Sequence, residues 1–152
     1  MQPPALEFAF EARVSVAPRI EAGLVQAGLR RIIPITGGVV EGPRLTGTVI
    51  PGGADWQIVS AGGVTDLTAR YTIEASDGTL IGVVNRGLRH TTPEIQARLD
   101  AGEAVDPALV YFRTTPVFEA PAGPHHWLTR HIFLGTARRH PAGVLLRFFT
   151  VL

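Results

Sequence analysis

The sequence predicts an all-β protein, a single antiparallel β-barrel of about nine strands with one short helix. Its apolar runs are short and are separated by turn residues, since the chain contains 17 glycines and 12 prolines. Several runs alternate between apolar and polar residues with a period of two, and one segment has helical spacing. A β-sandwich is the alternative architecture. We favour the barrel because closure leaves no exposed sheet edge.

The first half of the chain contains four predicted strands. Leu6–Val16 alternates loosely with a period of two, and Pro18 ends it. Leu29–Val40 is a second apolar stretch, in which Pro34 and the Gly37–Gly38 pair predict a bulge or a sharp bend. Two shorter strands follow over Leu45–Ile50 and Asp55–Val59. A turn at Pro51–Gly52–Gly53 separates them.

The second half begins with a predicted hairpin. Thr65–Ala75 and Leu80–Arg89 are strands on either side of Ser76–Asp77–Gly78, which is a strong hairpin signal. A helix is expected from Pro93 to Gly102, because Thr92 can cap it, proline is favoured at the first helical position and glycine closes it. Its apolar ridge can cover a sheet or a barrel end. Strands resume over Leu109–Glu119, Trp127–Ala137 and Val144–Val151.

Length and composition narrow the classes of protein. A chain of 152 residues fits one domain, spanning residues 1–152. Its formal net charge of +1 argues against nucleic-acid binding driven by bulk charge. No apolar run approaches the roughly 20 residues that cross a bilayer, and the first residues lack a secretory pattern. We therefore expect a cytoplasmic protein that binds neither nucleic acid nor membrane.

The sequence also lacks the residues for several chemistries. It has no cysteine, so there is no thiolate nucleophile and no cysteine-ligated metal. All 14 basic residues are arginine, which excludes lysine Schiff-base chemistry and a P-loop lysine. The histidines do not follow a known metal-site spacing, and the hydrolase, Rossmann and P-loop glycine motifs are missing. We expect neither a metal nor a cofactor.

Alternation shows which polar residues share a face with the core. On the strand over 65–75, Tyr71 lies among apolar residues on one face. On the partner strand, one face begins with Ile81 and Val83 and becomes polar at Asn85 and Arg89. This gradient predicts a dry barrel bottom and a polar mouth or cavity. Alternatively, the two polar residues lie where the strand leaves the core.

The strand over 109–119 has two possible orientations. If Tyr111 points inward, so does Arg113, and a buried arginine needs a carboxylate or an anionic ligand. If Phe112 points inward instead, the other two lie on the outer surface or in an oligomer interface. Asp55 follows a Gly-Gly pair that allows close backbone approach, and it is the carboxylate that best pairs with such an arginine.

Several short motifs, each weak alone, form a specific combination. They are Arg31–Gly38 (RIIPITGG), Gly52–Trp56 (GGADW), Asp77–Gly78, Asn85–Arg89 (NRGLR), Tyr111–Thr114 (YFRT) and Trp127–Leu128. From about Phe8 to Val151 the chain resembles the domain-of-unknown-function 3237 family of small, mostly bacterial proteins. The resemblance implies an antiparallel β-barrel that forms homo-oligomers. It implies no particular reaction.

The resemblance and the alternation put forward the same candidate residues. The catalytic candidates are Asp55, Arg113 and Tyr71. The ligand-binding candidates are Trp56, Asn85, Arg89, Tyr111, Trp127 and Thr129. Position 129 departs from the resemblance, which implies an asparagine there. Threonine keeps a hydroxyl donor with less reach.

Three classes of function fit these residues. The first, which we favour by a small margin, is a cofactor-independent isomerase, cyclase or lyase acting on a small, partly apolar molecule in the barrel. Asp55 would be its general acid or base with a pKa raised by burial, an arginine would stabilise negative charge, and a tyrosine would donate a hydrogen bond. The second is a non-catalytic binding protein for a hydrophobic, carboxylate-bearing metabolite held by Arg113. The third is a structural oligomer subunit.

Overall fold

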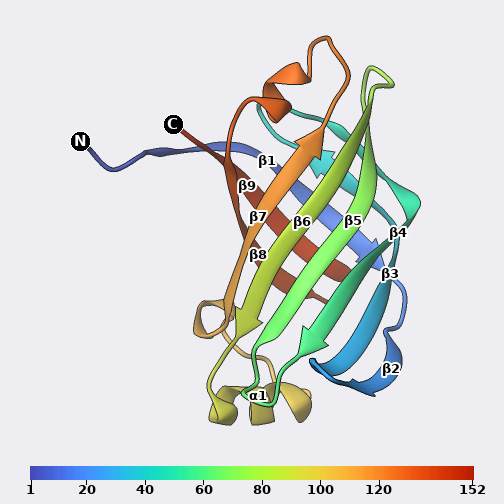
Figure 1. Ribbon diagram of the computed structural model, residues 1–152, viewed down its shortest axis with the longest axis vertical. Coiled ribbons are helices and arrows are strands. Elements are labelled where there is room, and N and C mark those ends of the chain that lie inside the picture. The colour runs from blue at the N-terminus through green and yellow to red at the C-terminus, as the bar shows by residue number, and fades with distance from the viewer.

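The computed structural model describes residues 1–152, which form strands, one α-helix and two short 3₁₀ helices (Figure 1). The strands are β1 (Leu6–Val16), β2 (Ile20–Val25), β3 (Gly28–Glu41), β4 (Gly47–Val59), β5 (Thr65–Ala75), β6 (Leu80–His90), β7 (Tyr111–Glu119), β8 (Phe133–His140) and β9 (Gly143–Val151). The helices are α1 (Pro93–Asp100), η1 (Pro107–Leu109) and η2 (His126–Thr129).

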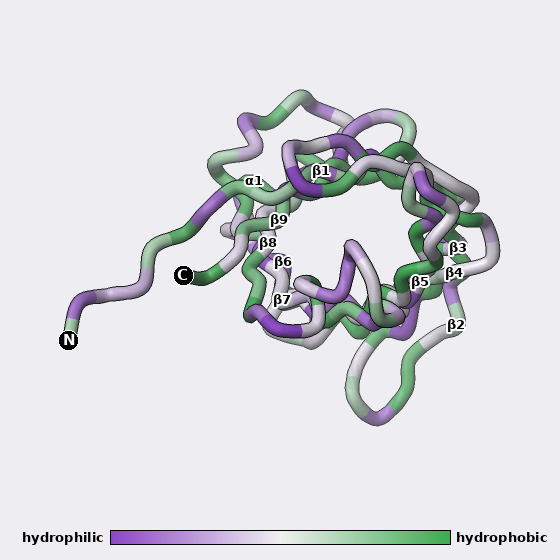
Figure 2. The backbone as a smooth tube through the Cα atoms, turned by 90° about the horizontal axis from the view of Figure 1, so that it is seen from above, coloured by the Kyte–Doolittle hydropathy of each residue, from purple (hydrophilic) through white to green (hydrophobic).

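All strands but β2 close into an antiparallel barrel. Neighbours in the sheet follow the order β1-β9-β8-β7-β6-β5-β4-β3-β2, and β1 also pairs with β3, which closes the ring and leaves β2 outside it. Seen from above, the strands form this ring and the β2–β3 hairpin projects from its wall (Figure 2). The predicted all-β barrel is therefore confirmed. A barrel of about eight strands has an interior that side chains fill or that holds one small ligand.

The strands of the first half differ from the predicted ones. Residues 47–59 form one continuous strand, β4, where the sequence predicts two strands and a turn. Pro51–Gly52–Gly53 instead forms a bulge, since the register of β4 against β5 shifts between Ile50 and Ala54. The predicted turn is wrong because bulges and tight turns use the same residues. Both need backbone conformations such as the φ of 114° at Gly52.

The hairpin strand β2 is absent from the predicted strands, because its side chains are mostly exposed and show no alternation. It pairs with the beginning of β3, from Gly28 to Ile32, while β1 pairs with β3 from Ile35 onward. The two strands therefore lie end to end along β3. Pro18 sits between them, at a point where a residue without an N–H interrupts no ladder.

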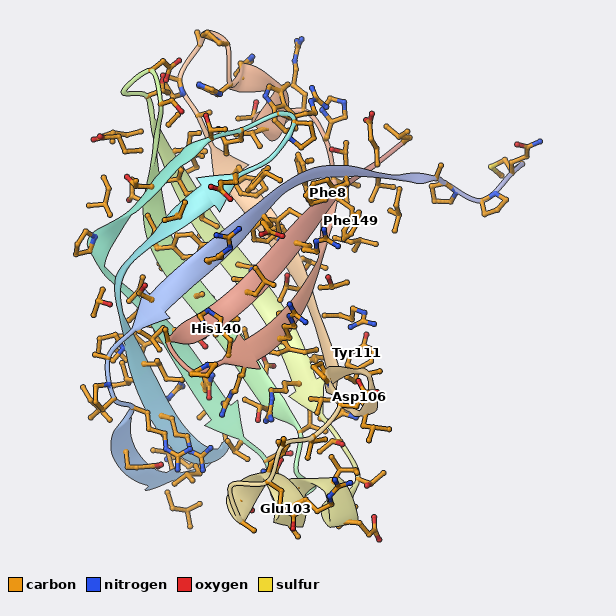
Figure 3. All side chains as sticks on the ribbon, turned by 180° about the vertical axis from the view of Figure 1, so that it is seen from behind. Phe8, Glu103, Asp106, Tyr111, His140 and Phe149 are labelled. Atoms are coloured by element: carbon orange, nitrogen blue, oxygen red, sulfur yellow. The ribbon has the colours of Figure 1, made fainter.

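The half of the barrel near the chain termini is filled by aromatic side chains. Phe10, Phe118, Phe133 and Phe148 are buried there, with ring centroids 5.0–5.9 Å apart in tilted or T-shaped pairs. Leu128 of η2 belongs to the same cluster. We call this the termini end. Phe8 and Phe149 lie there, whereas Tyr111 and His140 lie in the other half (Figure 3).

The predicted helix is confirmed as α1, which lies beneath the other end of the barrel (Figure 1). The Thr92 hydroxyl accepts a hydrogen bond of 3.3 Å from the N–H of Ile95, so the predicted cap is present. The strand predicted over Trp127–Ala137 is wrong in its first part, where η2 forms, and β8 begins only at Phe133. None of the helices has the length and apolarity needed to cross a membrane.

Candidate functional site

A cavity of about 260 Å³ lies inside the barrel, in the half away from the termini. Eleven of its 20 lining residues are hydrophobic. Its volume is just below the roughly 300–1,000 Å³ of typical small-molecule pockets, so it suits a small ligand. The lining residues at its open end mark what we call the mouth: Arg19, Arg139 and Pro141.

Six polar side chains with an unpartnered atom line this cavity. Asp55 and Gln57 come from β4, Tyr71 from β5, Asn85 from β6, Thr114 from β7 and His140 from the end of β8. Each has one buried oxygen or nitrogen without a hydrogen-bond partner, and these six make up most of the nine such atoms in the protein. Buried polar atoms are nearly always paired. Their concentration here indicates a place where a ligand or water completes the hydrogen bonds.

Asp55 is held in the cavity wall by a neighbouring amide. Its Oδ2 accepts a hydrogen bond of 2.8 Å from Nε2 of Gln57, while its Oδ1 has no partner. Burial raises the pKa of Asp55, because the protein interior disfavours the carboxylate. The Gln57 hydrogen bond and the positive charge of Arg139 offset only part of this effect. The carboxyl group is therefore suited to holding a proton and releasing it into the cavity.

The Tyr71 hydroxyl remains protonated in this environment. Burial raises its pKa, and the negative charge of Asp55 raises it further. Gly53 lets β4 lie close to β5 beside this residue, because a Cβ there would collide with the backbone of Arg70 and with the Cβ of Tyr71. The phenol is therefore a lasting hydrogen-bond donor near Asp55.

Two glycines make room for Thr114. Gly87 on β6 and Gly135 on β8 are its partners in the sheet register. A Cβ on either glycine would overlap the Thr114 side chain. The threonine hydroxyl therefore fits between strands only because both neighbours lack side chains, and it has no hydrogen-bond partner.

Three of the six cavity residues with an unpartnered atom are missing from the predicted candidates. Gln57 is two positions from Asp55, so alternation places both on one face. Thr114 shares a face with Phe112, but the direction of that face is open in the sequence. No sequence pattern marks His140, because it ends β8 beside the turn to β9.

Two predicted residues of β7 lie on the outer wall of the barrel. Phe112 and Thr114 are buried, whereas Tyr111 and Arg113 are exposed. Figure 3 labels Tyr111. A guanidinium N–H of Arg113 donates to the backbone oxygen of Phe112 at 3.0 Å, and the guanidinium lies 5.4 Å from the centre of the Tyr111 ring. Of the two orientations, the one with Phe112 inward is present. Arg113 does not face the barrel cavity or Asp55.

The remaining predicted residues are dispersed. Trp56 is 48% exposed on the outer face of β4. Trp127 packs against the core at the termini end, and Thr129 is exposed in η2. Arg89 lines a smaller cavity between α1 and the barrel. The predicted residues that the structure gathers in the main cavity are Asp55, Tyr71 and Asn85.

The cavity is equipped for hydrogen bonding and proton transfer. Its polar groups are a carboxyl, two primary amides, a phenol, a hydroxyl and an imidazole, with arginines at the mouth. No group of three or more His, Asp or Glu side chains is arranged to hold a metal ion, so no residue is assigned to a metal.

A family model described as "Protein of unknown function (DUF3237)" matches residues 4–151. The chain belongs to the DUF3237 family. A UPF0311 protein from Rhodopseudomonas palustris strain TIE-1 is 40% identical over 151 residues, which cover 98% of this chain and 99% of the relative. The crystal structure of a conserved protein of unknown function from the same species is 37% identical, covers 100% of both chains and has a TM-score of 0.93.

This DUF3237 protein also resembles proteins of the fungus Penicillium herquei. The hydroalkoxylation enzyme phnH is 37% identical over 79 residues, or 52% of each chain. The crystal structure of an enzyme from that fungus is 25% identical, covers 100% of this chain and 97% of the other, and has a TM-score of 0.76. The barrel fold is therefore shared with an enzyme.

Proposed function

We propose that this DUF3237 protein is an enzyme that binds a small, largely apolar molecule in the barrel and exchanges a proton with it at Asp55. The observation that carries the proposal is the gathering of six unpartnered buried polar atoms around one cavity. Leaving such an atom unbonded costs roughly 1–3 kcal/mol. Stability alone does not favour this arrangement, whereas a bound molecule can supply the missing hydrogen bonds.

Among proton-transfer reactions, we favour the addition of a hydroxyl group across a carbon–carbon double bond. Support comes from the relative named as a hydroalkoxylation enzyme. The protonated Asp55 carboxyl donates its proton to one alkene carbon, and the hydroxyl oxygen bonds to the other carbon and returns its proton to Asp55. A π bond and an O–H bond break while C–H and C–O bonds form. When the alkene and the hydroxyl group belong to the same substrate molecule, the addition closes a ring and the reaction is a cyclisation.

The other cavity residues have matching roles in this proposal. Tyr71, whose pKa is raised, donates a hydrogen bond to the substrate oxygen and stays neutral. Gln57 orients the Asp55 carboxyl through the hydrogen bond to Oδ2. Asn85 and Thr114 offer polar atoms that position the substrate. Elimination uses the same groups because it is the reverse of addition. Isomerisation by proton transfer uses them as well.

The substitution Asp55→Asn tests the proton transfer. Purified protein is incubated in heavy water with a panel of alkenyl phenols and alkenyl alcohols, and mass spectrometry detects cyclic ether that carries one deuterium on carbon. We expect Asp55→Asn to lower the rate about 100-fold or more, as loss of a general acid does. The control is Asp66→Asn, an outer-wall aspartate that lies 3.1 Å from Arg86, and it should keep the full rate.

A full rate in Asp55→Asn would contradict the role of this carboxyl. If the wild-type protein binds members of the panel in the cavity and converts none, the second candidate is favoured, a non-catalytic binding protein. The unpartnered cavity atoms support that candidate as well, because a bound molecule would satisfy them without any reaction.

A further inference from the structure

Four arginines gather at the mouth of the cavity. Arg19 and Arg139 are among the lining residues. Arg31 is paired with Gln57 across β3 and β4, so it lies on the inward face of the sheet. Arg89 lines the smaller neighbouring cavity together with Arg139. The four side chains come from β3, β6, β8 and the link between β1 and β2, so only the closed barrel brings them together.

These arginines are close enough to repel one another. Burial lowers the pKa of Arg89 to about 10, and the positive charges of Arg139 and Arg31 contribute. Burial also lowers the pKa of Arg139, again with contributions from the positive charges of Arg19 and Arg31. The mouth is therefore a region of concentrated positive charge.

The protein supplies too few carboxylates to balance this charge. Glu21 serves two of the arginines, because its Oε1 lies 2.9 Å from Nε of Arg19 and 3.2 Å from Nε of Arg31. Arg89 and Arg139 make no salt bridge. The negative charge of Asp100 attracts Arg89 without forming a salt bridge with it. Asp55 is the carboxyl that attracts Arg139, and its burial favours the neutral acid.

We propose that the arginines at the mouth bind the carboxylate of an amphipathic organic acid, whose apolar part occupies the barrel cavity. The inference rests on the proposed function of the same cavity and names its substrate class. Arg139 is the main contact because it lines the cavity and makes no salt bridge within the protein. Guanidinium groups match the planar carboxylate with paired hydrogen bonds. The sequence predicted Arg113 for this role, but that residue lies on the outer wall.

Matched small probes test the assignment. Binding of hydrocinnamate, its uncharged isostere hydrocinnamamide and phenethyl phosphate is measured by calorimetry for the wild type, Arg139→Gln and Arg113→Gln. We expect the wild type to bind hydrocinnamate at least tenfold more tightly than the amide, and more tightly than the phosphate. Arg139→Gln should weaken hydrocinnamate at least tenfold and leave the amide unchanged. Arg113→Gln is the matched control and should alter neither.

Other outcomes overturn the inference. One is equal affinity of the wild type for hydrocinnamate and hydrocinnamamide. Another is a preference for hydrocinnamate that is kept in both Arg139→Gln and Arg19→Gln. Tighter binding of the phosphate overturns the carboxylate assignment, and so does the absence of binding by every probe at millimolar concentration. Arg19→Gln gives a second reading if Arg139→Gln does not fold. Hydrocinnamamide separates the two proposals. If the wild type binds it as tightly as hydrocinnamate, the carboxylate assignment fails but the proposed function of the cavity remains intact.

Discussion

Asp55 occupies a wall position at which an apolar side chain would favour folding. Its Oδ1 is buried without a partner, although Leu67 and Ala69 line the same cavity. Gln57 supplies one hydrogen bond, and the rest of the solvation that the carboxyl loses is not replaced by the protein. This loss of stability fits the role proposed for Asp55, because stability and activity commonly oppose each other at a site.

The raised pKa of Asp55 predicts how stability depends on pH. Above its ordinary value of 3.8, the unfolded chain loses the proton before the folded protein does. Stability therefore falls as pH rises through the window up to the folded pKa, and the loss is complete above it. We expect Asp55→Asn to have a higher Tm than the wild type at pH 7, by about 2–4 °C for each kcal/mol recovered.

Thermal denaturation from pH 3 to pH 8 measures this difference. The two proteins should converge at the acid end, where Asp55 is protonated in both states. The Tm of Asp55→Asn minus that of the wild type is the quantity to follow. If this difference is smaller at pH 7 than at pH 3, the ionised carboxylate stabilises the fold. Asp66→Asn is again the control for loss of an exposed charge.

At the scale of elements, the strand pairings of the barrel are unequal. β5 and β6 pair without interruption from Thr65–Arg89 to Glu74–Leu80. β7 and β8 are joined in register at Arg113–Thr136 and Thr114–Gly135 alone. Long uninterrupted ladders open only with the whole fold, whereas short ones open locally. The β7–β8 seam is therefore the part of the wall most ready to open.

Hydrogen exchange followed by mass spectrometry tests this seam. Peptides that cover β8 should exchange faster than those that cover β5 and β6, because fewer ladder bonds protect their amides. A ligand in the cavity should slow exchange in β7, since Phe112 and Thr114 line the cavity. Equal protection of all three strands would show that the barrel opens as one unit.

At the scale of the whole molecule, the two halves of the barrel interior differ in how they are filled. The termini end is filled by phenylalanine rings, such as those of Phe10 and Phe148 at 5.0 Å. The mouth half encloses the cavity with its unpartnered polar atoms. The polarity gradient that the sequence predicts along β6 follows this division, since Ile81 and Val83 belong to the core cluster and Asn85 lines the cavity.

Substitutions in the two halves should have opposite effects on stability. Phe148→Ala removes a buried ring from a filled core and should cost about 3–5 kcal/mol. Asn85→Leu removes a buried amide whose oxygen has no partner, and should raise the free energy of unfolding by about 1 kcal/mol while weakening ligand binding. Urea denaturation with the wild type as reference measures both. A loss in Asn85→Leu as large as that in Phe148→Ala would assign Asn85 to the structural core.

The sequence by itself determined the features that depend on neighbouring residues. The all-β class, the capped helix α1 and the hairpin at Ser76–Asp77–Gly78 follow from local propensity and period-two alternation. Alternation also placed Tyr71 on the core face of β5 and Asn85 on the inward face of β6, and both line the cavity.

Only the tertiary structure decided the features that depend on pairing between distant strands. Alternation shows which residues share a face, but the register around the closed ring decides that Phe112 and not Tyr111 points inward. The same register makes residues 51–53 a bulge in β4, which keeps Asp55 and Gln57 in the cavity wall. The arginines of the mouth are far apart in the sequence and meet because β1 pairs with β3 and closes the barrel.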